Sequence, residues 1–183
     1  MSYELDKTSQ KKIIIAISLC SIAVLLYFVL GSNNSAISSE RTISFSRTVD
    51  VGKKEIFDAM ADVNKYPEIL LDSFLSVNII NRTDSTIFAE EEVREAGVKT
   101  KLLVKHTIVP YQVHILEIMN GDAKGTTIKE TYEEAGNSST ILITDVNMTL
   151  KGPLSYFAYL EYSNIEHAIN TVIDDFVNYV KNR

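Results

Sequence analysis

The stretch from Pro153 to Lys181 constrains the fold more than any other part of the sequence. It holds no glycine and no second proline, and a proline is tolerated in the first turn of a helix, where an N–H has no helical partner. Apolar side chains recur in it at steps of three and four, which places them on one helix face. These residues are Phe157, Leu160, Ile165, Ala168, Ile169, Val172, Phe176 and Tyr179. We therefore expect a single helix of roughly 28 residues.

A helix of this length needs an equally long apolar surface to cover its stripe. At 1.5 Å per residue it extends over about 40 Å. Its opposite face carries polar residues, among them Glu166, Asn170 and Asp174. A curved sheet built from the preceding strands supplies such a surface.

The residues from Glu40 to Leu150 have the pattern of strands, with two short helices near the beginning. Alternating polarity predicts a strand up to Val49, and helical spacing then predicts a short helix over 51–62. Pro67 begins a second short helix. Six further extended segments, separated by turn residues, are 73–82, 85–95, 98–109, 112–120, 125–135 and 139–150. Their short connections favour an antiparallel meander, and the fold class is α+β.

The N-terminal part contains an apolar run long enough to cross a membrane. Ile13 to Leu30 are 18 consecutive residues without a charge, at the lower limit for a hydrocarbon core of about 30 Å. Two alternatives fit less well, because a cleavable signal peptide has a shorter apolar region and a buried core helix has polar breaks. We therefore expect an uncleaved transmembrane helix.

The positive charges around this run predict its orientation. Lys7, Lys11 and Lys12 precede it, and the first cation after it is Arg41. The positive-inside rule then leaves the C-terminal domain outside the cytoplasm. The predicted order is a cytoplasmic tail, a transmembrane helix, a linker and a folded domain, over residues 1–12, 13–30, 31–39 and 40–183.

Charge and cysteine content exclude several classes of function. From Glu40 onward the chain has 15 Lys and Arg against 22 Asp and Glu, a formal charge of −7. Such a surface repels phosphate backbones, so we expect no nucleic-acid partner. Cys20 is the only cysteine and lies in the apolar run, so it forms no intrachain disulfide and no cysteine metal cluster.

Several short motifs resemble those of a known superfamily. Val49 to Phe57 (VDVGKKEIF) combines a strand, a small turn and an E-x-[VI]-[FW] pattern, and Asp62 to Pro67 (DVNKYP) ends in the pair Tyr-Pro. Val109-Pro-Tyr111 and Asn120-Gly121 precede two later strands. Over about Glu40 to Arg183 the chain resembles the START-like, or SRPBCC, superfamily. Within it, the resemblance is to polyketide cyclase/dehydrase-like and coenzyme Q-binding START-type domains.

The resemblance implies a helix-grip fold, in which a curved antiparallel sheet of about seven strands is wrapped on the long C-terminal helix. It also implies a cavity between this helix and the concave face of the sheet. The helical segment with Tyr66, Pro67, Ile69 and Leu70 would flank the mouth of that cavity, where it could act as a mobile apolar lid or simply cap the sheet edge.

Alternation along the strands predicts which side chains face such a cavity. His106 shares a face with Leu102 and Val104, Glu130 with Tyr132, and Glu91 lies among inward apolar residues. The predicted ligand-binding residues are Tyr66, Ile69, Leu70, Glu91, Leu102, Val104, His106, Tyr132, Thr144, Phe157, Ile165 and Val172.

His106 and Glu130 are the candidates for acid–base chemistry. A buried carboxylate near an imidazole perturbs both pKa values and can transfer protons or orient a ligand. The alternatives are a hydrogen-bonded core histidine and a glutamate turned to solvent by a bulge. His114 and His167 look isolated, and no pair has metal-ligand spacing, so we expect no metal and no cofactor.

Three hypotheses of function follow. The first is a membrane-anchored protein that takes a hydrophobic small molecule (a lipid, an isoprenoid or a quinone-like compound) into the cavity. The second is a cyclase or dehydratase-type enzyme that uses the same cavity. The third is an interaction module whose cavity is filled by side chains, because one fold hosts many functions.

Overall fold

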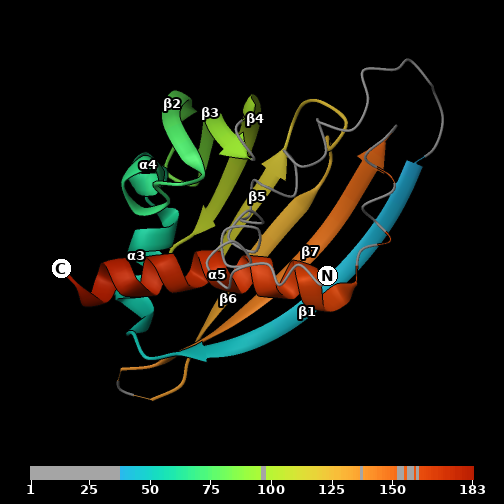
Figure 1. Cartoon of the computed structure of the whole chain (residues 1–183). Helices are drawn as coiled ribbons and strands as arrows, with labels where there is room; N and C mark the ends of the chain where they lie inside the picture. The colour runs from blue at the N-terminus through green and yellow to red at the C-terminus, as the bar shows by residue number, and fades with distance from the viewer. Residues whose placement is uncertain (1–37, 96–97, 137, 152–154, 156–158, 160) are drawn as a thin grey trace, which may run out of the picture.

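The structure is a computed structural model that describes residues 38–95, 98–136, 138–151, 155, 159 and 161–183. The elements along these residues are strands with two short helices after the first strand and one long helix at the end (Figure 1). They are β1 (Ser38–Val49), α3 (Lys53–Ala61), the 3₁₀ helix η1 (Val63–Lys65), α4 (Tyr66–Ile69), β2 (Phe74–Arg82), β3 (Thr86–Glu95), β4 (Val98–Val109), β5 (Val113–Ile118), β6 (Thr127–Glu134), β7 (Thr140–Lys151) and α5 (Tyr162–Lys181).

The strands form one antiparallel sheet in the order β1-β7-β6-β5-β4-β3-β2. Strands β2 to β7 form a meander, which confirms the antiparallel arrangement predicted from the short connections. The first strand pairs with the last along its whole length, from Ser38 opposite Lys151 to Val49 opposite Thr140. This pairing brings the start of the domain next to the end of β7.

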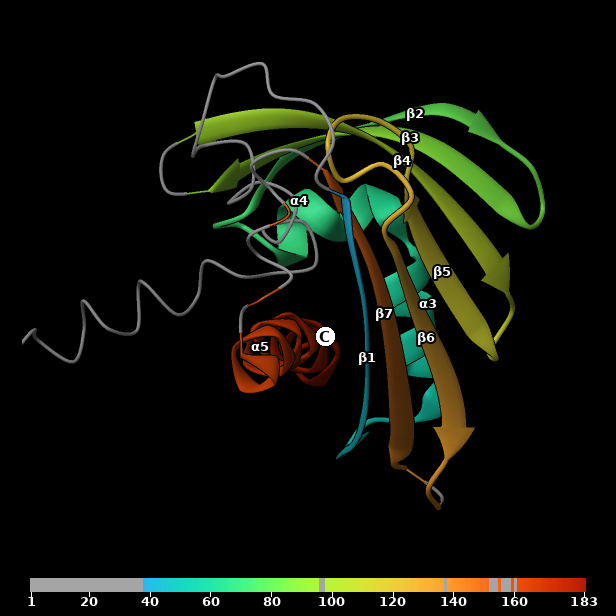
Figure 2. The ribbon, with the colours of Figure 1, turned by 90° about the vertical axis from the view of Figure 1, so that its right-hand side faces the viewer.

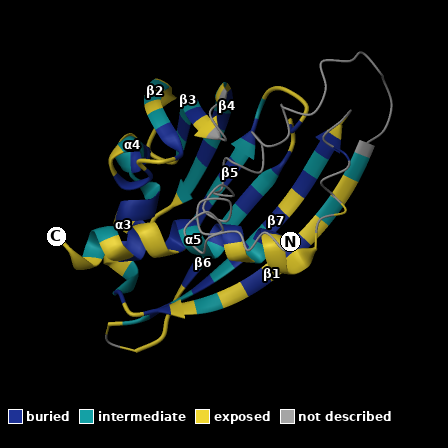
Figure 3. Ribbon diagram, in the orientation of Figure 1, coloured by how far each residue is buried: buried dark blue, intermediate teal, exposed yellow. Residues whose placement is uncertain are grey.

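The sheet curves around α5. Figure 2 looks along the axis of this helix and shows it on the inner side of the curved sheet. Buried and exposed residues alternate along the strands, and one face of the helix is buried (Figure 3). The buried residues of α5 are Ile165, Ala168, Ile169, Val172, Ile173, Phe176 and Val177. The predicted helix-grip arrangement is therefore confirmed.

The C-terminal helix is shorter than the sequence predicts. It begins at Tyr162, because Glu161 has extended backbone angles (φ −59°, ψ 141°) that interrupt a helix. Residues 161–164 are all exposed, and Ile165 is the first buried residue of the helix. The prediction of a continuous helix from Pro153 is thus wrong at Glu161. Phe157 and Leu160 lie outside the described residues.

The two short helices close one end of the sheet. Ile56, Phe57, Ala59 and Met60 of α3 are buried at helical spacing, as an amphipathic helix requires. Helix α4 has a proline in its first turn, in agreement with the start predicted from Pro67.

None of the described helices is both long and apolar enough to cross a membrane. The predicted span, 13–30, lies outside the described residues.

Candidate functional site

A row of polar side chains crosses the concave face of the sheet. Glu91 on β3, His106 on β4, His114 on β5, Glu130 on β6 and Thr144 on β7 are each at most 1% exposed. Strand alternation turns them all to the inner face, where the other inward residues are mainly apolar. Buried polar groups are costly unless they are hydrogen-bonded, so the partners of this row determine what it can do.

Hydrogen bonds join the first three residues into a chain. Glu91 Oε1 lies 2.9 Å from Nε2 of His106. The other ring nitrogen of His106, Nδ1, lies 3.1 Å from Nε2 of His114. Both nitrogens of His106 are therefore occupied, and His106 connects Glu91 to His114.

Tyr132 holds Glu130 from the same strand. Its hydroxyl donates to Oε2 of Glu130 over 2.9 Å and also lies 3.6 Å from the sulfur of Met60. Burial, and then the charge of Glu130, raise the pKa of Tyr132 well above its usual value. Tyr132 thus remains a protonated donor at neutral pH.

His114 and Glu130 face each other without a hydrogen bond. Nδ1 of His114 is 3.7 Å from Oε2 of Glu130, which is beyond hydrogen-bond distance. Burial lowers the pKa of His114, although the carboxylate of Glu130 opposes this shift. Desolvation is the larger effect, and it favours a neutral imidazole.

Three atoms of the row have no hydrogen-bond partner: Nδ1 of His114, Oε1 of Glu130 and Oγ1 of Thr144. The three residues are directly opposite one another, since His114 pairs with Glu130 and Glu130 pairs with Thr144 in the sheet. Neighbouring strands are about 4.8 Å apart, so the row spans about 10 Å. A fourth unpartnered atom, Oγ1 of Thr100, belongs to β4 and is not a member of this row.

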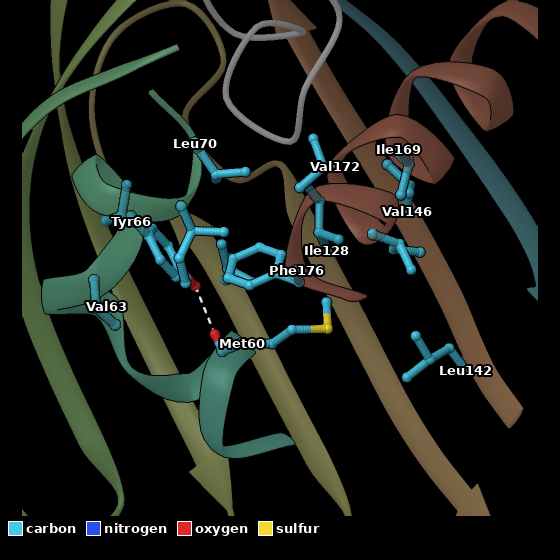
Figure 4. Packing of buried hydrophobic residues seen from close by; sticks show 14 of the residues in the cluster. Met60, Val63, Tyr66, Leu70, Ile128, Leu142, Val146, Ile169, Val172 and Phe176 are labelled. Carbon is cyan, nitrogen blue, oxygen red and sulfur yellow. Dashed lines mark hydrogen bonds between the residues drawn. The ribbon is translucent and has the colours of Figure 1, made fainter. Parts of the chain in front are cut away.

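Apolar side chains surround the row. Ile128 precedes Glu130 on the inner face of β6, and Leu142 and Val146 flank Thr144 on β7. Figure 4 shows Ile128 and Val146 on the side of the sheet that faces Val172 and Phe176 of α5. The remaining labelled side chains in this view are Met60, Val63, Tyr66, Leu70 and Ile169.

Tyr66 of α4 packs beside the polar chain. Its ring has edge contacts with His106, Phe74 and Phe176, at centroid distances of 6.1, 5.2 and 5.7 Å. Its hydroxyl donates to the backbone oxygen of Met60 over 2.9 Å (Figure 4). Tyr66 therefore links α4, α3 and α5 next to His106.

An open groove of about 680 Å³ lies outside this core, between α4 and the C-terminal end of α5. Its lining residues are Lys65, Glu68, Ile69, Asp175, Asn178, Tyr179, Asn182 and Arg183. Burial, and then the neighbouring carboxylates of Asp174 and Asp72, raise the pKa of Asp175. Ile69 is the one predicted ligand-binding residue among these lining residues.

The structure gathers most of the predicted site residues around the concave face. Those on the sheet are Glu91, Leu102, Val104, His106, Tyr132 and Thr144, together with the acid–base candidate Glu130. Tyr66 and Ile69 lie on α4, Leu70 directly follows it, and Ile165 and Val172 lie on α5. Phe157 falls outside the described residues.

Sequence reasoning missed His114, which it treated as isolated. The alternation of β5 contained the necessary signal, because His114, Leu116 and Ile118 share one buried face. The described part of the chain contains no group of three or more His, Cys, Asp or Glu side chains that could hold a metal ion.

No protein-family model and no curated protein sequence matches the chain, whereas many solved structures do. An aromatase/cyclase, Zhui from Streptomyces sp. R1128, is 13% identical, with a TM-score of 0.63 over 75% of this chain and 94% of that one. Norcoclaurine synthase from Thalictrum flavum is 11% identical, with a TM-score of 0.61 over 85% of this chain and 98% of that one. Ara h 8.0201 is 15% identical, with a TM-score of 0.62 over 79% and 100%.

These similarities span nearly the whole of each solved structure, at identities that establish the fold and not the activity. The fold implied by the sequence motifs and the fold of these proteins agree. The chain has the helix-grip fold of the START-like, or SRPBCC, superfamily, to which these aromatase/cyclase and norcoclaurine synthase structures belong.

Proposed function

We propose that the domain binds a hydrophobic small molecule between the concave face of the sheet and α5. The observation that carries this proposal is the row of three unpartnered atoms on His114, Glu130 and Thr144, directly opposite one another in a buried apolar surrounding. A buried polar atom without a partner costs about 1 to 3 kcal/mol. A ligand that supplies the missing hydrogen bonds removes this cost.

The apolar residues around the row provide the surface for the body of the ligand. Burial of apolar area contributes about 25 cal/mol per Å², so a ligand that buries about 300 Å² gains about 7.5 kcal/mol before the entropy cost of binding. The similar structures add support, since one norcoclaurine synthase was solved in complex with a transition state analogue.

Helix α4 is the element that we expect to open for the ligand. It has only four residues, and Leu71, immediately beyond it, is 70% exposed. Ile69 of α4 lines the open groove, and Tyr66 of the same helix contacts Phe176 of α5. A small displacement of α4 would therefore connect this groove to the interior.

We further propose that residues 13–30 anchor the protein in a membrane, with the domain on the extracytoplasmic side. The segment 31–37 between this span and β1 reaches at most about 25 Å when fully extended. The domain would then stay next to the bilayer, from which a hydrophobic ligand can enter it.

Co-purification tests the binding proposal. The full chain is expressed with a specific protease site in 31–37, and the domain is cleaved from the membrane without detergent. Native mass spectrometry and organic extraction should then detect one bound hydrophobic molecule per domain. An empty domain that also fails to bind a panel of fluorescent lipids and quinones would favour an interaction module whose cavity is filled by side chains.

Two simple experiments test the anchor. The full chain should remain in the membrane pellet after an alkaline carbonate wash, and a chain that lacks residues 1–30 should not. A protease added to intact cells should cut the domain. Protection of the domain in intact cells would contradict the proposed orientation.

A second candidate, a cyclase or dehydratase-type enzyme, is favoured by the contact of His114 with Glu130. Both ring nitrogens of His106 are occupied, so the nitrogen able to accept a substrate proton is Nδ1 of His114. His114→Gln would then abolish turnover but only weaken ligand uptake, because Glu130 and Thr144 remain in the row. Equal turnover by this variant would exclude the enzymatic role.

A further inference from the structure

The hydrogen-bonding roles of the unpartnered row can be assigned from its neighbours. Nε2 of His106 faces the carboxylate of Glu91, so a neutral His106 carries its proton there and donates. Its Nδ1 must then accept, and the proton between the rings belongs to Nε2 of His114. The remaining nitrogen of His114, Nδ1, is consequently an acceptor.

The two other unpartnered atoms are also able to accept. Oε2 of Glu130 accepts from Tyr132, which leaves Oε1 of the same carboxylate free. Oγ1 of Thr144 has two lone pairs and no partner. The row therefore presents three acceptors in line across β5, β6 and β7.

The row also lacks positive charge. Among the described residues, no Lys or Arg forms an ion pair with Glu130, and the one basic side chain that pairs with it within 4 Å is His114, at 3.7 Å. Burial lowers the pKa of His114, so this neighbour is predominantly neutral at neutral pH. A buried carboxylate in this position is stabilised by a cation that reaches it.

We propose that the row binds the primary ammonium group of an amphiphilic amine. This assignment rests on the proposed function, in which the tail of the amine packs against the apolar side chains between the sheet and α5. The N–H groups of an alkylammonium ion can donate to Oε1 of Glu130 and to Oγ1 of the adjacent Thr144, and its charge offsets that of Glu130.

Other head groups match the row less well. A carboxylate or phosphate would bring a second negative charge next to Glu130. An alcohol has a single O–H donor for three acceptors. A buried water molecule has two donors and carries no charge, so it would satisfy part of the row and leave Glu130 uncompensated.

A series of ligands with one common tail tests this assignment. Dodecylamine, dodecyltrimethylammonium, dodecanol and dodecanoate differ in charge and in the number of donors. Binding of each radiolabelled compound is measured on the full chain in nanodiscs, with empty nanodiscs as the reference for partition into lipid. The variants are Glu130→Gln, Thr144→Val and the control Glu133→Gln, an exposed glutamate on the same strand.

Dodecylamine should bind one to one and at least about tenfold more tightly than the other three compounds, because charge-assisted hydrogen bonds are worth about 1.5 to 3 kcal/mol. E130Q should reduce its affinity by about tenfold or more and change dodecanol binding much less. T144V should weaken amine binding by a smaller factor, and E133Q should leave it unchanged. Unaltered melting curves of E130Q and E133Q would show that both variants are folded.

The possible failures are distinguishable. Absence of binding for all four compounds would overturn the proposed function itself. Equal binding of amine and alcohol, with no effect of E130Q, would retain a hydrophobic-ligand site and overturn the ammonium assignment. Equal binding of dodecylamine and dodecyltrimethylammonium would show that charge alone attracts the ligand, and would also overturn the assignment.

Discussion

The imidazole rings of His106 and His114 lie stacked on neighbouring strands, with centroids 5.3 Å apart and planes inclined by 20°. A hydrogen-bond contact of 3.1 Å joins Nδ1 of His106 to Nε2 of His114, and Glu91 and Glu130 flank the pair. The two rings therefore join side chains of four neighbouring strands, β3 to β6, into one buried polar cluster.

The stability of the domain should fall between about pH 7 and pH 5 because of His114. Its pKa is lowered in the folded state by burial, so the unfolded chain binds more protons once the pH falls below about 6.5. Stability is therefore fully present above that pH and is lost as the pH falls, by up to about 1.4 kcal/mol per pH unit. Urea unfolding of the wild type at several pH values measures this slope.

The variant His114→Gln should show a shallower slope over the same range, since glutamine does not titrate. His106, Glu91, Glu130 and Tyr132 remain in place around it. An unchanged slope in this variant would assign the pH dependence to another group.

Glu91 and His106 should be strongly coupled in a double-mutant cycle. Each is completely buried, so Glu91→Leu alone leaves Nε2 of His106 without this acceptor, at a cost of about 1 to 3 kcal/mol. The double variant Glu91→Leu/His106→Leu should lose less than the sum of the two single variants, with a coupling energy of about 0.5 to 3 kcal/mol.

The neighbouring pair Glu90 and Lys101 is a matched control on the same two strands. Its ion pair is 3.0 Å long but exposed, so its coupling energy should be below about 1 kcal/mol. Chemical denaturation of the two cycles compares them directly. Equal coupling energies would show that burial does not strengthen the contact between Glu91 and His106.

Phe176 should be among the most important residues for stability. It is fully buried on α5 and packs against Tyr66, so Phe176→Ala should lower the free energy of unfolding by about 3 to 5 kcal/mol. Asn178→Ala, at an exposed position two residues later, should change it by about 0.5 kcal/mol or less. Thermal and urea unfolding measure both values. A loss below about 1 kcal/mol for Phe176→Ala would mean that the helix does not depend on this contact.

The sequence was sufficient to predict the strands and the inward direction of their side chains. Alternation depends only on local geometry, which is why the inward positions of Glu91, His106 and Glu130 follow from spacing alone. The pairing of β1 with β7 brings together residues that are about a hundred positions apart, and no local pattern contains that information.

The contacts within the site depended on register and curvature. His106 is directly opposite Leu116, not His114, so the contact of the two imidazoles is diagonal across the strand pair. The start of α5 was not predictable for a related reason. Polar residues such as Ser163 and Asn164 can lie at the start of a helix or in its interior, so the sequence does not distinguish the two. In the structure Glu161 has an extended backbone, and the helix begins after it.

Two threonines on β7 provide the sharpest comparison between stability and function. Thr140 and Thr144 are both fully buried on the inner face of the same strand. Oγ1 of Thr140 donates to the backbone oxygen of Val51 over 2.7 Å, whereas Oγ1 of Thr144 has no partner. Valine has nearly the same shape as threonine and lacks the hydroxyl, so the two Thr→Val substitutions differ mainly in the hydrogen bond that they remove.

Thr140→Val should destabilise the domain by about 1 to 2 kcal/mol, because it breaks a hydrogen bond and leaves the carbonyl of Val51 with one donor fewer. Thr144→Val should stabilise the ligand-free domain by about 1 kcal/mol, because it removes the cost of a buried hydroxyl without a partner. Urea unfolding of the two variants measures the sign and size of each change in stability. A loss of stability for Thr144→Val in the ligand-free domain would mean that another group already satisfies its hydroxyl. A gain in stability combined with weaker binding would show that the hydroxyl of Thr144 lowers the stability of the ligand-free domain and contributes to ligand binding.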